Sequence, residues 1–207
     1  EAQTLLDRLN AIPDAGLNDA ERANKGVLAR ILSEQVQGNR FGQRLMLFTT
    51  YASPYQGLAD MGSYVPLYTA ADYRSYLARL AQFPKVNADI ISITREAIKK
   101  GFVQPCDAMN GFETTIAGAI EGKPEDTRFY EPFTRAKPND VSDADWAAMK
   151  AEGLRLIRDV LVPGYRQFAD FYMKDYKPKC AAKVGISSQP GGKEFYAFQA
   201  RSHTTTD

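Results

Sequence analysis

Apolar residues along this chain recur mainly at the three- and four-residue spacing of an α-helix. The clearest stretch begins at Thr69-Ala70-Ala71-Asp72, a capping-box pattern that predicts a helix start. Asn18-Asp19-Ala20-Glu21 predicts a second start in the same way. Each start is followed by one apolar helical face, formed by Tyr73, Tyr76, Leu77 and Leu80 in one case and by Leu28, Ile31, Leu32 and Val36 in the other.

The same spacing continues through the second half of the chain. Ser142-Asp143-Ala144-Asp145 predicts the cap of a long helix that carries Trp146 to Leu161. Pro163-Gly164 should kink or break this helix, because proline removes a backbone donor and clashes with the preceding turn. A last helix is expected from Lys193 to about His203, after the turn at Gly191-Gly192. The residues predicted to continue the buried face are Tyr165, Phe168, Phe171, Tyr172 and Tyr176.

Between these helices the pattern is less regular. Pro84 ends one helix or starts the next, and Gln104-Pro105 is expected to open another that carries Phe112, Ile116 and Ile120. Residues of about 47–68 form an expected long loop, and residues of about 123–141 an irregular connector. No strand pair is evident. We therefore predict an all-α fold, a multi-helix array with long connecting loops, with 1–207 as a single helical domain or half-domain.

Composition narrows the possible partners. Of the 207 residues, 44% are hydrophobic and 25% charged, which is ordinary for a globular protein. The formal net charge of +1 provides no basic field for nucleic acid, so a nucleic-acid partner is not expected. No apolar run approaches the roughly 20 residues that a membrane-spanning helix needs, so no transmembrane segment is expected.

Histidine is the scarcest catalytic residue type, since His203 is its single occurrence. A zinc hydrolase normally uses two or more imidazoles, and a serine or cysteine triad needs a mobile base. We therefore expect no catalytic residue and no metal ligand in this chain. The chain also closes on a polar run, Arg201 to Asp207, without a helix stop. We expect it to be part of a larger enzyme-like protein, without the catalytic part.

Two features of the residues leave alternatives open. The C-terminal polar side chains could form a hydrogen-bonding edge for an anionic or peptide ligand, or a solvated terminal run; they are Arg201, His203, Thr204, Thr205 and Thr206. Cys106 and Cys180 lie too far apart for a redox Cys-x-x-Cys motif or a zinc ribbon. They are either a structural disulfide or two unrelated thiols.

Several stretches in order along the chain carry a family resemblance. They are Tyr73 to Leu80, the 90–101 helix with Gln104-Pro105, Leu161 to Tyr165, Pro190 to Tyr196 and His203 to Asp207. Together they resemble the N-terminal half of a bacterial family known as domain of unknown function 885. Its members look like helical, gluzincin-type metallopeptidases, often exported to the periplasm or attached to the envelope as lipoproteins.

The resemblance implies more than the pattern does. Zinc is expected only in a C-terminal half, where the family's His-Glu motif lies, and none of its ligands matches a residue of this chain. The C-terminal half of the same protein is then the expected partner, with a peptide as the expected substrate. By the resemblance, the segment from Tyr196 through Thr205 approaches the cleft of the intact protein. An exported protein also favours the Cys106–Cys180 bridge, because disulfides persist outside the cytosol.

Three functions therefore compete. The first is a non-catalytic N-terminal helical portion that forms one wall of a substrate cleft and packs on the C-terminal catalytic half. The second is a stand-alone helical binding or scaffolding module of the bacterial envelope, which uses the Tyr51–Tyr64 loop as its contact surface. The third is a small complete enzyme with a carboxylate-only or Tyr/Lys mechanism. The first is preferred, with this chain alone predicted to be inactive.

Overall fold

A computed structural model describes residues 1–204 and confirms the all-α prediction. Within this described part there is no β-sheet. The β-type pairing found there is an isolated parallel bridge between Pro105 and Ala181. The chain divides into two compact units, Glu1–Met46 with Gly185–Asp207 and Leu47–Val184. Each unit is described by itself.

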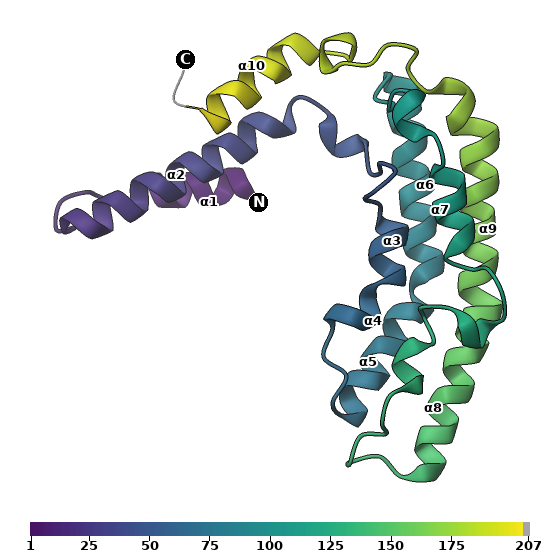
Figure 1. The fold of residues 1–207 in the computed structure, drawn as a ribbon. Coiled ribbons are helices and arrows are strands. Elements are labelled where there is room, and N and C mark those ends of the chain that lie inside the picture. Colours follow the sequence, from purple (N-terminus) through teal and green to yellow (C-terminus); the bar gives the residue numbers. More distant parts are fainter. Residues whose placement is uncertain (205–207) are drawn as a thin grey trace. The chain divides into compact units, whose positions relative to one another are not determined.

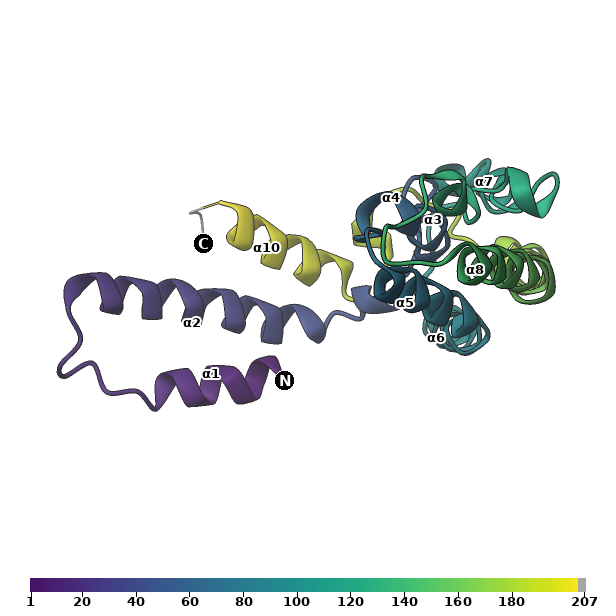
Figure 2. The ribbon, with the colours of Figure 1, turned by 90° about the horizontal axis from the view of Figure 1, so that it is seen from below.

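The first unit is built from three helices. They are α1 (Ala2–Asn10), α2 (Asp19–Asn39) and α10 (Gly192–His203). The predicted capping box is present at the start of α2, where the Asn18 side chain accepts from the Glu21 amide and the Glu21 carboxylate accepts from the Asn18 amide, both at 2.9 Å. The α1 helix lies alongside α2 (Figure 1 and Figure 2).

Burial in the first unit is sparse. No residue of α1 is buried, and Leu32 is the buried residue of the 21-residue α2. The α10 helix packs beside α2 through the ring of Phe198, which lies 3.5 Å from the position of a Cβ on Gly38. The Phe41 ring lies 5.5 Å from that of Phe195 and 5.3 Å from that of Phe198. This aromatic cluster is therefore the main packing of the α10 end of the unit.

The second unit holds the hydrophobic core. Its longest element runs without interruption from residue 143 to 176 and is α-helical over α8 (Asp143–Leu156) and α9 (Val162–Phe171). The other helices pack around it; α6 and α7 both lie against α9 (Figure 1). They are α3 (Pro54–Ala59), α4 (Met61–Tyr64), α5 (Ala70–Ala81), α6 (Phe83–Lys100) and α7 (Phe112–Gly118).

Aromatic side chains dominate this core. The five aromatic residues predicted to be buried between Tyr165 and Tyr176 all are, with at most 6% of each exposed. The α5 stripe is confirmed as well, since Tyr73, Tyr76 and Leu80 are no more than 1% exposed. Both of these tyrosines anchor the irregular 123–141 segment, because Tyr73 donates to the Pro132 carbonyl and Tyr76 to the Phe129 carbonyl, each at 2.8 Å.

Of the expected kink or break at Pro163-Gly164, the break is wrong. Two π-helical turns, Ile157–Leu161 and Tyr172–Tyr176, flank α9 instead, and the helix continues through them. A π turn shifts the backbone bonding from i→i−4 to i→i−5 and so leaves a carbonyl without its usual donor. Pro163 follows the first π turn directly, at the start of α9, where its missing N–H is tolerated.

Two other expectations need correction. The 47–68 segment, expected as a long loop, contains α3 and α4, because Tyr55, Ala59 and Met61 turn into the core and are at most 5% exposed. Gln104-Pro105 does not open a helix, since Gln104 accepts a hydrogen bond from the Ala181 amide in the bridge, and α7 begins later at Phe112. Pro84 starts α6 and does not end α5.

Candidate functional site

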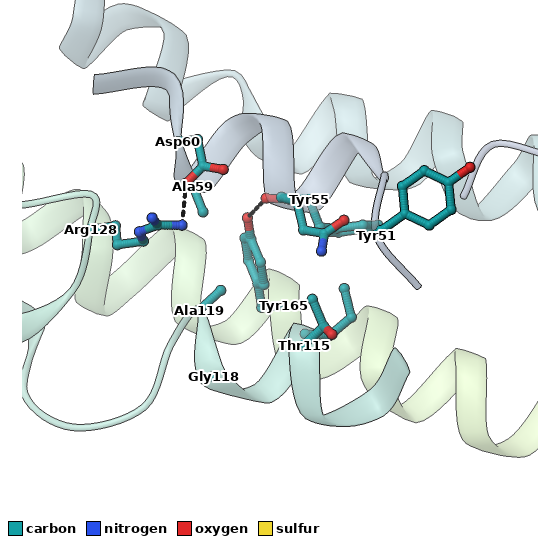
Figure 3. Close-up of a pocket in the computed structure, with 11 residues that line it drawn as sticks. Tyr51, Tyr55, Ala59, Asp60, Thr115, Gly118, Ala119, Arg128 and Tyr165 are labelled. Carbon is teal, nitrogen blue, oxygen red and sulfur yellow. Dashed lines mark hydrogen bonds and ion pairs between the residues drawn. The ribbon is translucent and has the colours of Figure 1, made fainter. Parts of the chain in front are cut away.

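The candidate site is a pocket in the second unit, between α3, α7 and α9 (Figure 3). Its volume is about 250 Å³, slightly below the usual range for a small-molecule site. The lining combines three tyrosines, one threonine, one side-chain amide and an ion pair. The residues that line it are Tyr51, Tyr55, Gln56, Ala59, Asp60, Thr115, Ile116, Gly118, Ala119, Arg128 and Tyr165.

A chain of buried hydrogen bonds fixes the wall of the pocket. Tyr165 on α9 donates to the Tyr55 carbonyl at 2.6 Å, and Tyr55 on α3 donates to Asn87 Oδ1, also at 2.6 Å. The Asn87 amide then donates to Gln167 Oε1 at 2.8 Å and to the Gly164 carbonyl at 3.2 Å. Asn87 on α6 is 1% exposed, and α3 and α9 supply the hydrogen-bond partners of this buried side chain.

The rim of the pocket carries its charges. Arg128 forms an ion pair with Asp60, which caps the end of α3 (Figure 3). The Gln56 amide donates to the Thr50 carbonyl at 3.3 Å, while its Oε1 is buried and accepts no hydrogen bond from the described part of the chain. The Tyr51 ring is 85% exposed and stands at the mouth.

The electrostatics of the wall favour binding over proton transfer. Burial raises the pKa of Tyr55 far above its usual value, and the neighbouring Tyr165 adds to this effect. Burial likewise raises the pKa of Tyr165, with further contributions from Asp60 and Tyr76. Both phenols therefore stay protonated at any physiological pH and act as hydrogen-bonding groups. Both hydroxyls are already bonded within the wall, and the two tyrosines are at most 1% exposed, so they fix the shape of the pocket.

The residues predicted to line a cleft belong to the first unit, on and after α10, and the pocket belongs to the second. Tyr196 is 65% exposed, and Arg201 and His203 are also exposed. The Arg201 carbonyl accepts from Arg30 at 3.4 Å, and the Thr204 hydroxyl donates to the Ala200 carbonyl at 2.6 Å. Thr205 lies outside the described residues. The cleft-lining role of this segment stays a prediction.

The cysteines form a bridge. Cys106 and Cys180 are joined in a disulfide, with their Cα atoms 5.0 Å apart. The adjoining backbone supports the link, since the Cys106 amide donates to the Ala181 carbonyl and the Ala181 amide to the Gln104 carbonyl, each at 2.9 Å. Of the two alternatives left open by the residues, the structural disulfide is the one present.

The sequence analysis singled out the 51–64 segment as a contact surface but missed four members of the pocket. Thr115, Gly118, Ala119 and Arg128 carry no motif, and they lie on or after α7, which packs against α9. Among residues 1–204, no group of three or more His, Cys, Asp or Glu side chains is placed to hold a metal ion. No helix in the same range is both long and apolar enough to span a membrane.

The fold and the pocket define an all-helical protein with a mainly aromatic core. A family model described as "Bacterial protein of unknown function (DUF885)" matches residues 1–207, so the chain belongs to that family. None of the curated proteins matches the sequence.

A solved structure shares the fold. It is the crystal structure of a "putative lipoprotein from Colwellia psychrerythraea", with a TM-score of 0.83 and 15% sequence identity. The match covers 100% of this chain and 37% of that chain, so this chain spans little more than a third of the length of the solved structure.

Proposed function

We propose that this chain is the non-catalytic helical portion of an exported protein of the family, and that it packs on a C-terminal half of the same protein. The observation that carries the proposal is the solved relative, in which this fold occupies 37% of a longer chain. In this proposal the helical portion forms one wall of a substrate cleft and the C-terminal half supplies the zinc site.

The first unit offers a surface for such a partner. Val27, Leu28 and Ile31 share one side of α2, at positions i, i+1 and i+4, and are 61%, 45% and 47% exposed. Leu32, four residues after Leu28, lies at the edge of this face and is buried, and Lys25 donates to the Ile12 carbonyl at 2.5 Å. A helix gains most of its stability from burying an apolar face. The exposed apolar side of α2 therefore fits a surface that the C-terminal half covers.

Catalysis belongs, in this proposal, to the C-terminal half. The family resemblance places zinc and its His-Glu motif there, and the 196–205 segment of this chain approaches the cleft beside it. A peptide is the proposed substrate of the whole protein. Export is supported by the relative's description as a lipoprotein and by the Cys106–Cys180 disulfide, because such bonds persist in oxidising compartments.

The first test is the coding sequence. An open reading frame that continues past Asp207 and encodes a downstream His-Glu motif supports the proposal, whereas a stop codon directly after Asp207 overturns it. The longer polypeptide should retain tightly bound zinc after dialysis, and the 207-residue chain should retain none. Stoichiometric zinc on the 207-residue chain contradicts the assignment.

The second test addresses the packing surface. Amide hydrogen exchange in α2 should be slower in the longer polypeptide than in the 207-residue chain. Leu28→Glu should remove most of that extra protection. Gln37→Glu places the same charge on a different side of α2 and serves as the matched control. Equal exchange rates in the two polypeptides would show that nothing covers this side of α2.

A stand-alone binding module is the second candidate, and one observation favours it. Tyr51 and Tyr64 are 85% and 65% exposed, and they flank α3 on a surface with open pockets. Exposed tyrosines supply a large, rigid contact area and are enriched in binding surfaces. This candidate gains support if the 207-residue chain is monomeric and its α2 exchanges at the same rate in every context.

A further inference from the structure

A second hollow in the second unit has a composition unlike that of the pocket in Figure 3. It is a groove of about 300 Å³ on another side of α3, bounded by α3 and α4 on one flank and by α5 and α6 on the other. Most of its lining is apolar, with a single charged residue. The lining residues are Pro54, Gly57, Leu58, Met61, Tyr64, Arg79, Phe83, Val86 and Ile90.

The floor of the groove is rigid. Met61, Phe83 and Ile90 are 5%, 2% and 6% exposed, so their side chains belong to the core as well as to the groove. Gly57 opens the α3 flank, because nothing lies within 4 Å of the position where its Cβ would stand. The Tyr64 ring is held over that flank by a hydrogen bond from its hydroxyl to the Gly57 carbonyl at 2.7 Å. The groove is thus a preformed apolar slot.

Arg79 supplies the charge. It lies in the last turn of α5, is exposed, and its guanidinium forms no hydrogen bond or ion pair with a described residue. Asp72, which lines a small hollow together with Arg79, is already engaged. Its carboxylate accepts from the Tyr68 and Thr69 amides at the start of α5. An unpaired guanidinium therefore borders an apolar slot.

We propose that this groove binds the C-terminal residue of a peptide, with its apolar side chain in the slot and its free α-carboxylate on Arg79. A guanidinium matches the two oxygens of a carboxylate in a bidentate pair. The volume suits one side chain and its terminal carboxylate and is too small for a long acyl chain. This inference concerns the second unit alone and does not depend on the packing proposed for α2.

The experiment uses the 207-residue chain and one fluorescein-labelled peptide in three forms. The forms end in leucine with a free carboxylate, in leucine amide, and in lysine with a free carboxylate. Fluorescence polarisation should give the tightest binding for the first form. Loss of a charge-assisted hydrogen bond should weaken binding about ten-fold or more for the amide. Equal binding of the first two forms overturns the proposal, and so does the absence of binding.

Variants locate the binding. Arg79→Gln should weaken binding of the free-carboxylate peptide about ten-fold or more and leave the amide form unchanged. Arg74→Gln is the matched control, because Arg74 is an exposed arginine on the same helix that lines none of the pockets described here. Val86→Glu should block the slot, and since Val86 is 45% exposed the variant should fold, which circular dichroism checks.

Three outcomes count against the groove. An equal loss of binding in Arg79→Gln and Arg74→Gln would indicate a general charge effect. Unchanged binding in Val86→Glu would place the peptide elsewhere. Competition by octanoate as strong as that by the unlabelled peptide would show that any apolar carboxylate binds and would overturn the peptide assignment. A failure of α2 packing changes none of these measurements.

Discussion

Replacing Gly164 on α9 by alanine adds a single methyl group and should measurably lower the stability of the protein. A Cβ at Gly164 would stand 2.4 Å from Cε1 and 3.0 Å from Cδ1 of the Phe83 ring on α6. The Phe83 ring must then move by about 1 Å to reach ordinary contact. It has little room, because it stacks on Tyr165 at 5.2 Å and meets the Tyr55 ring edge-on at 6.1 Å.

The magnitude follows from two opposing effects. Overpacking a buried site costs about 1–3 kcal/mol, and an enclosed ring at 2.4 Å belongs at the upper end of this range. Alanine in place of glycine inside a helix contributes about 1 kcal/mol in the other direction. Gly164→Ala should therefore lower the free energy of unfolding by about 1–2 kcal/mol.

Urea denaturation followed by circular dichroism measures this difference. Gly57→Ala is the control, since Gly57 lies in α3 with nothing within 4 Å of its Cβ position, and it should be neutral or stabilising. Phe83→Leu combined with Gly164→Ala should cost less than the sum of the two single changes, because the clash is removed. A Gly164→Ala protein as stable as Gly57→Ala would refute the reasoning about close packing between α6 and α9.

Three further predictions follow from features of the second unit. Replacing Cys106 and Cys180 by serine should lower the free energy of unfolding by about 4 kcal/mol in the chain-entropy account, because the bridge joins residues 74 positions apart. Denaturation with and without reductant tests this. If reductant does not change the stability of the parent protein, the prediction is wrong. Burial raises the pKa of Tyr172 to about 12, so its contribution to stability is complete below pH 10 and is lost as pH rises from 10 towards 12. The free energy of unfolding, measured between pH 8 and 12, should therefore fall steeply at the alkaline end. A free energy that stays constant over this range would count against the prediction. Thr69→Ala should lower the free energy of unfolding by about 1 kcal/mol, because the Thr69 hydroxyl accepts a hydrogen bond from the Asp72 amide at the start of α5. An unchanged denaturation midpoint would argue against a stabilising role for that cap.

Much of the fold can be predicted from sequence where local signals and burial agree. At the start of α5, the capping box at Thr69 and the stripe from Tyr73 to Leu80 point to the same helix, and both are present. The π turns could not be predicted, because the spacing of apolar residues across 157–176 also fits an ordinary α-helix. The α3 and α4 helices have only six and four residues, too few to show a helical period among the surrounding Gly, Ser and Pro, and they form because Tyr55 and Met61 pack into a core made by distant segments.

The candidate sites were harder to predict than the fold. The pocket depends on Thr115, Arg128 and Tyr165, which no sequence motif connects and which meet through the packing of α7 on α9. Arg79 is one of many arginines in the sequence, and its significance comes from the apolar groove beside it. The disulfide could be suggested because there are two cysteines, although their distance along the chain gave no geometric argument for pairing.

The two π turns that flank α9 constrain how this long helix can vary in evolution. Each accommodates one residue more than a regular α-helical turn, and one residue corresponds to a rotation of about 100° around the axis. Loss of a single codon within 157–161 would rotate everything downstream and carry Phe168 away from the core. Relatives that keep this architecture should therefore retain the length of the 143–176 helix even where its surface residues differ.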